Sequence, residues 1–144
     1  MGAAASIQGL PDEINEQQFK YLAGKLYSPS LFQKLRGTNG LITKQTFIDF
    51  TDKATDVYLT HDWSKDELDR DNHERVRLVN KALQSRGLKT WFDSDKMIGD
   101  VKEKMTDGID TTCCVIVFIT QNYMDKVAGK GPKGVDDNCL YEFR

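Results

Sequence analysis

The stretch that decides the fold is a run of seven apolar residues in the second half of the chain, Cys113-Cys114-Val115-Ile116-Val117-Phe118-Ile119. Threonine bounds the run on both sides, and its β-branched residues favour a strand. A short, unbroken apolar run of this kind is typical of a strand covered on both sides in a parallel sheet. We therefore expect 113–119 to be a buried strand, with Cys113 and Cys114 as small apolar core residues rather than reactive thiols.

Strand and helix signals alternate upstream of this run. Residues 57–60 and 88–92 are β-branched and aromatic, which predicts two strands. Each is followed by apolar residues at helical spacing, namely Val76, Val79 and Leu83 after the first, and Val101, Met105 and Ile109 after the second. The alternation predicts βαβ units with right-handed crossovers, and so a parallel α/β sheet.

The first half of the chain has a different pattern. Residues 10–53 carry apolar positions at helical spacing, which predicts short helices in a small all-α helix-loop-helix segment. Residues 35–47 resemble an EF-hand loop running into its exit helix, but the residues at the calcium-ligand positions 1, 3, 5 and 12 are Leu35, Gly37, Asn39 and Thr46. Since no carboxylate is present among them, we expect a helix-loop-helix that binds no calcium.

The composition limits the kinds of partner. The chain has 144 residues, 39% of them hydrophobic, and a formal net charge of -2. There is no basic field to hold nucleic acid, and no apolar run reaches the roughly 18 residues that span a bilayer. The three cysteines suit neither a disulfide framework nor a zinc site, so we expect a reducing, cytoplasmic location and no metal. We divide the chain into residues 1–9, 10–53 and 54–144.

The N-terminus carries a separate signal. Gly2 follows Met1, and Ser6 stands four places beyond Gly2, which is the pattern of N-myristoylation. The alternative is an unmodified, alanine-rich start. One acyl chain binds membranes only marginally, with a constant of about 10⁴ M⁻¹, so the expected membrane contact is weak, peripheral and reversible.

Four blocks in the second half match a known family in order and spacing: Asp56-Val57-Tyr58-Leu59-Thr60, Gly87-Leu88-Lys89-Thr90-Trp91-Phe92-Asp93, Val115 to Tyr123, and Cys139-Leu140-Tyr141-Glu142-Phe143. Together they resemble the TIR (Toll/interleukin receptor) domain. The resemblance implies intracellular signal transduction, including innate immunity, through association with other TIR domains, and a homo-oligomer. It assigns the contacts to the BB loop, here Asp93, Asp95, Met97, Ile98 and Gly99.

The same resemblance implies a second function, because some TIR domains are NAD⁺ nucleosidases. Nicotinamide leaves as a neutral base, so one carboxylate beside the ribose suffices to stabilise the oxocarbenium-like centre. The resemblance places that carboxylate at Glu142, with NAD⁺ as substrate and no separate cofactor. The expected substrate-binding residues are Thr60, His61, Asp62, Trp91 and Asn138. The alternative for Glu142 is an ordinary solvated helix residue.

The chain also departs from the family pattern. The aromatic residue expected four places before the glutamate is Asn138, and residues 125–137 form a longer, glycine-rich connection. Its lysines, Lys126, Lys130 and Lys133, either contact a pyrophosphate or are solvated on a surface loop. The resemblance implies a flavodoxin-like sheet with the strand order 2-1-3-4-5, so a complete TIR domain continues with two further strands. We therefore expect residues 54–144 to be C-terminally incomplete, with the 113–119 strand at an edge of the sheet. The alternatives are a fragment, a degenerate copy, or a domain whose edge a partner covers.

Overall fold

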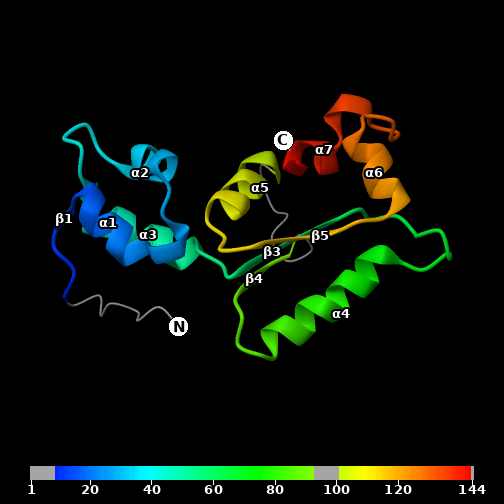
Figure 1. Ribbon diagram of the computed structural model, residues 1–144, viewed down its shortest axis with the longest axis horizontal. Helices are drawn as coiled ribbons and strands as arrows, with labels where there is room; N and C mark the ends of the chain where they lie inside the picture. Colours follow the sequence, from blue (N-terminus) through cyan, green and yellow to red (C-terminus); the bar gives the residue numbers. More distant parts are fainter. Residues whose placement is uncertain (1–8, 93–100, 144) are drawn as a thin grey trace. The chain divides into compact units, whose positions relative to one another are not determined.

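The computed structural model describes residues 9–92 and 101–143 and divides into two compact units, Met1–Ala54 and Thr55–Arg144 (Figure 1). Each unit is described below by itself. Several predicted residues lie outside the described ranges, namely Gly2 and the BB-loop residues Asp93, Asp95, Met97, Ile98 and Gly99.

The first unit packs three helices around a phenylalanine cluster. Its elements are β1 (Glu13–Ile14), α1 (Glu16–Ala23), the 3-10 helix η2 (Gly24–Leu26), α2 (Pro29–Leu35), β2 (Ile42–Thr43) and α3 (Lys44–Lys53). β1 pairs with β2 antiparallel. The ring of Phe19 lies 5.7 to 6.2 Å from the rings of Phe32, Phe47 and Phe50. These buried rings form the core of the unit.

The loop between α2 and α3 closes through polar contacts of its own. Asn39 donates a hydrogen bond of 2.9 Å to Glu13 and accepts the Leu41 N–H at 3.1 Å. Gly40 has φ +80°, the left-handed conformation that favours glycine. No group of three or more His, Cys, Asp or Glu able to hold a metal ion occurs in the described part of the chain. The resemblance to an EF-hand stays a prediction.

The second unit is an α/β domain, as the sequence predicts. Its elements are β3 (Val57–His61), α4 (Asn72–Gln84), β4 (Thr90–Trp91), α5 (Val101–Asp110), β5 (Val115–Phe118), α6 (Gln121–Val127), the 3-10 helix η4 (Gly134–Asp136) and α7 (Asn138–Phe143). The three strands are parallel in the order β4-β3-β5, which is the predicted order 2-1-3. α4 lies on one side of the sheet, and α5, α6 and α7 lie on the other (Figure 1).

Strand β3 is buried along its whole length and supplies both layers of the core. Its alternate side chains face opposite sides, because successive residues of a strand point in opposite directions. Val57 and Leu59 pack with Val76 of α4 and with Phe92. Tyr58 packs with Trp91 and with Met105 of α5. Thr60 shares the face of Tyr58, so both hydroxyls point towards the layer that contains α7.

Strand β5 is an edge strand of the described sheet, as predicted. The expectation that 113–119 is covered on both sides is wrong. Val115, Val117 and Ile119 are 42%, 39% and 69% exposed. Val115 pairs with Tyr58 and shares its face, where the helices bury Tyr58 completely but leave β5 open. Cys113 and Cys114 precede the strand and are exposed, so they are not core residues.

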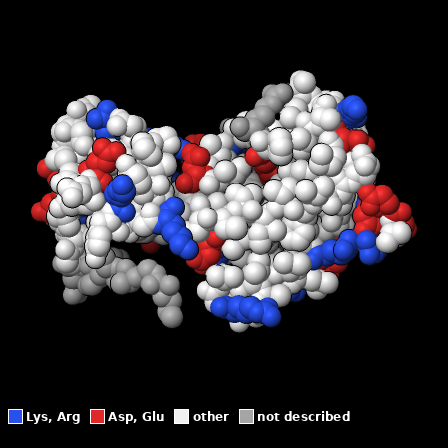
Figure 2. Space-filling model, in the orientation of Figure 1, with Lys and Arg blue, Asp and Glu red and all other residues white. Residues whose placement is uncertain are grey.

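Among the described residues, no helix is long and apolar enough to cross a bilayer. On the face drawn in Figure 2, the Lys and Arg side chains of the described residues are interspersed with Asp and Glu.

Candidate functional site

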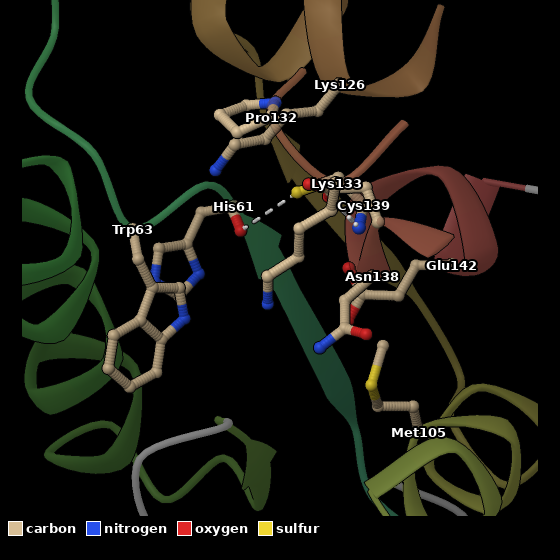
Figure 3. Close-up of a pocket in the computed structure, with 10 residues that line it drawn as sticks. His61, Trp63, Met105, Lys126, Pro132, Lys133, Asn138, Cys139 and Glu142 are labelled. Atoms are coloured by element: carbon tan, nitrogen blue, oxygen red, sulfur yellow. Dashed lines mark hydrogen bonds between the residues drawn. The ribbon is translucent and has the colours of Figure 1, made fainter. Parts of the chain in front are cut away.

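A pocket of about 420 Å³ opens on the side of the sheet that carries α6 and α7 (Figure 3). Residues from the end of β3, from α5, from α6 and α7 and from the loop between them surround it: His61, Trp63, Met105, Lys126, Pro132, Lys133, Asp137, Asn138, Cys139 and Glu142. The carboxyl end of β3 lies beside it. In open α/β sheets this edge of the strands is where ligands bind.

The carboxylate of Glu142 is held by two hydroxyls from β3. The Tyr58 hydroxyl donates to Oε1 at 2.6 Å, and the Thr60 hydroxyl donates to Oε2 at 2.5 Å. Each oxygen of the carboxylate therefore accepts a hydrogen bond from a hydroxyl of the buried strand. The contact depends on strand geometry, because side chains two positions apart on a strand share a face.

Packing in the core fixes the side chain of Tyr58. The ring of Tyr58 stacks on the indole of Trp91, with centroids 4.3 Å apart and planes 14° apart. Gly108 of α5 makes a close approach to the same indole: a Cβ there would lie 2.6 Å from Nε1 of Trp91. Trp91 thus contacts both the Tyr58 ring and α5, and this packing is called the clamp on Trp91 below. It positions Tyr58, and through Tyr58 it positions Glu142.

A stack of rings follows β3 at the rim of the pocket. The Nε2 atom of His61 lies 2.8 Å from Nδ1 of His73, and the indole of Trp63 lies 4.1 Å from the His73 ring. Phe92 closes the stack, 5.5 Å from His61 and 5.0 Å from His73. Trp63 is 55% exposed, so it offers a flat surface to a planar ring of a ligand.

Asp62 directly follows β3 and is buried next to pocket-lining residues, but it does not itself line the pocket. Its side chain is fully buried and accepts hydrogen bonds from Ser64, Thr120 and Asn72. Burial raises the pKa of Asp62, but the hydrogen bonds from Ser64 and Thr120 outweigh burial and leave the pKa below its ordinary value. Thr120 is also the N-cap of α6. Asp62 thus joins the end of β3 to α6, and the geometry favours this structural role over contact with a substrate.

Cys139 lies in the pocket wall but is a poor nucleophile. Its thiol is buried, and burial raises its pKa to about 12. The Sγ atom lies 3.8 Å from the carbonyl oxygen of His61, a weak contact typical of a structural cysteine. Any catalytic group in this pocket is therefore a side chain with an oxygen or nitrogen atom, and not the Cys139 thiol.

The structure brings together only part of the predicted site. His61, Asn138 and Glu142 line the pocket, and Thr60 holds Glu142. Trp91 and Asp62 lie behind the wall, at 5% and 0% exposure. Sequence reasoning did not select Tyr58 or Trp63. The signal for Tyr58 was present, because it stands two places before Thr60 on the same strand.

These features define an open α/β domain with a carboxylate-containing pocket at the carboxyl end of its first strand. The model of the TIR domain family matches residues 57–143, and the chain belongs to that family. The match confirms the family and the fold class expected from the sequence. No curated protein and no solved structure matches the chain. TIR domains in general mediate interaction with other TIR domains in signalling.

Proposed function

We propose that this protein acts in signal transduction inside the cell through self-association of its TIR domain. The observation that carries the proposal is the family match, which spans nearly the whole second unit. Gly2 myristoylation would add a weak, reversible membrane contact.

Sedimentation velocity of the full chain over a range of concentrations tests self-association. The proposal requires a weight-average mass that rises with concentration towards at least a dimer. A mass that stays monomeric to the highest soluble concentration contradicts it.

A second candidate function is favoured by the geometry of Glu142. We propose that the pocket cleaves NAD⁺ between C1′ of the ribose and N1 of nicotinamide. Because the nicotinamide ring takes the bonding electron pair and loses its positive charge, it needs no proton to leave. The Glu142 carboxylate stabilises the positive charge that develops at C1′, and water then adds to C1′. The products are nicotinamide, ADP-ribose and one proton.

Two contacts support this role for Glu142. Tyr58 and Thr60 fix both carboxylate oxygens, so the charge is oriented before the substrate binds. Trp63 lines the same pocket and, at 55% exposure, offers a ring surface on which a base can stack. Incubating the protein with NAD⁺ and measuring nicotinamide by chromatography tests the activity directly.

A further inference from the structure

The connection between α6 and α7 makes backbone contacts with α6 and within itself, although several of its side chains are exposed. The Lys130 N–H donates to the carbonyl of Asp125 at 2.8 Å, and the Gly134 N–H donates to the carbonyl of Gly131 at 3.0 Å. A Cβ on Gly131 would lie 2.8 Å from Cγ of Lys126, so a larger residue at this position would require Lys126 to move. This packing brings Lys133 into the wall of the pocket.

Two of the three lysines in this region line the pocket. Lys126 is 20% exposed, with Nζ 3.8 Å from the buried Asp62, and Lys133 makes no ion pair with any residue of the described ranges. Figure 3 shows both side chains directed into the space beside His61. Lys130 and Lys133 are both exposed, but only Lys133 lines the described pocket. The pocket thus holds two cations, only one of which has a carboxylate partner.

The carboxylates of the pocket are engaged by other groups. Asp137 accepts the Cys139 N–H at 3.0 Å, and Glu142 accepts the hydroxyls of Tyr58 and Thr60. The two cations come from α6 and from the loop that follows it, whereas the proposed catalytic carboxylate comes from α7. In a nicotinamide dinucleotide, the phosphates are attached at C5′ and the scissile bond at C1′ of one ribose, so such a ligand offers one group to the cations and another to Glu142.

We propose that Lys126 and Lys133 form a phosphate subsite that holds the pyrophosphate of the dinucleotide while Glu142 faces C1′. This inference rests on the proposed NAD⁺ cleavage. It names the part of the substrate that the pocket recognises: a nucleoside diphosphate group next to the reacting ribose. Lysine suits this role because its ammonium group acts as a point charge towards phosphate. Substrates without phosphate, such as nicotinamide riboside, bind weakly.

Binding of ADP-ribose to the full chain tests the subsite without requiring turnover. Calorimetry compares the unaltered protein with Lys133→Gln, Lys126→Gln and the matched control Lys130→Gln. We expect Lys133→Gln to weaken ADP-ribose binding about tenfold, the size of one charge-assisted hydrogen bond. Lys126→Gln should weaken it by a similar factor, and Lys130→Gln by less than about twofold. Adenosine binding should be the same in all four proteins, since adenosine has no phosphate.

The outcomes separate the subsite from the activity. If ADP-ribose binds and depends on Lys133 but nicotinamide is never released, the subsite stands and NAD⁺ cleavage fails. If nicotinamide is released equally by the unaltered protein and Lys133→Gln, with equal KM, the subsite is wrong and cleavage stands. Absence of ADP-ribose binding, or equal weakening by Lys130→Gln and Lys133→Gln, overturns the subsite.

Discussion

The hydroxyl of Tyr58 lies 2.6 Å from the carboxylate of Glu142, although the two residues are 84 positions apart in the sequence. Tyr58 is in the fully buried first strand of the sheet, and Glu142 is in the last described helix. The bond therefore joins the proposed catalytic group directly to the core of the domain. Any change that moves the Tyr58 ring also moves Glu142.

Replacing Tyr58 by phenylalanine tests this positioning role. The ring keeps its place on Trp91, but the carboxylate loses one donor. We expect kcat for NAD⁺ cleavage to fall about tenfold with KM unchanged, because orientation is lost and binding is kept. The free energy of unfolding should fall by about 1.5 to 3 kcal/mol, the usual contribution of a hydrogen bond to a charged group.

The matched control for this variant is Tyr27→Phe. The Tyr27 hydroxyl donates to Glu16 at 2.9 Å in the first unit, so the same chemical group is removed from the same type of pair. Activity should not change in the control. A loss of activity equal to that of Tyr58→Phe would count against positioning.

Gly108→Ala tests the clamp on Trp91. A Cβ at 2.6 Å from a buried indole forces repacking, which costs about 1 to 3 kcal/mol. Alanine in place of glycine in a helix regains up to about 1 kcal/mol. We therefore expect a net loss of about 1 kcal/mol in urea unfolding, whereas Gly9→Ala, where no atom lies within 4 Å, should have no effect. A more stable Gly108→Ala protein contradicts the clamp.

Acid should destabilise the second unit below pH 4. Hydrogen bonding to Arg70 holds the pKa of Asp66 at about 2, against an ordinary value of 3.8, and Arg75 adds a second ion pair. Since the folded pKa is the lower one, this stabilisation is complete above about pH 4 and is lost as the pH falls through about 2. The lowered pKa of Asp62 acts in the same direction.

Urea midpoints measured from pH 5 to pH 2 check this dependence. In Asp66→Asn the decline between pH 4 and pH 2 should be shallower than in the unaltered protein. Equal slopes in the two proteins would show that Asp66 is not the group that titrates.

Ile98→Asp tests the association surface that the family resemblance assigns. A charge buried in an apolar contact between two protein surfaces has a high desolvation cost. We therefore expect the protein concentration at which half of the chains are associated to rise about tenfold or more. Tyr21→Asp is the control, because it introduces the same charge at a side chain that is 87% exposed in the first unit. Equal sedimentation behaviour of Ile98→Asp and the unaltered protein would exclude this residue from the interface.

The sequence predicted the architecture of the second unit well, because the spacing of apolar residues and the succession of strands and helices can be read along the chain. The parallel βαβ units follow from strand and helix signals that alternate along the chain, and the strand order 2-1-3 is the one that the resemblance to the TIR family implies. The helical face with Met105 and Ile109 packs on Tyr58 and Trp91, as a spacing of four predicts. Burial of β5 was predicted wrongly, because an apolar run specifies a strand but not whether both of its faces are covered.

The site was only partly predictable. The resemblance pointed to Glu142, and the pocket holds it, but the two donors to its carboxylate are tertiary contacts. The entry of Lys133 into the pocket depends on the close approach of Gly131 to Lys126, which no sequence pattern reveals. Asp62 stands beside predicted site residues, yet its burial and its hydrogen bonds with three side chains give it a structural role.

The central claim is that Glu142 is the catalytic carboxylate of an NAD⁺-cleaving TIR domain. The most direct measurement compares nicotinamide release from NAD⁺ by the unaltered protein and by Glu142→Gln, in samples matched for association state and urea midpoint. Glutamine keeps one oxygen to accept a hydroxyl hydrogen but carries no charge. We predict that the unaltered protein releases nicotinamide and ADP-ribose in equal amounts, and that Glu142→Gln is at least about 100-fold slower. No release by the assembled, unaltered protein, or equal rates in the two proteins, would contradict the claim.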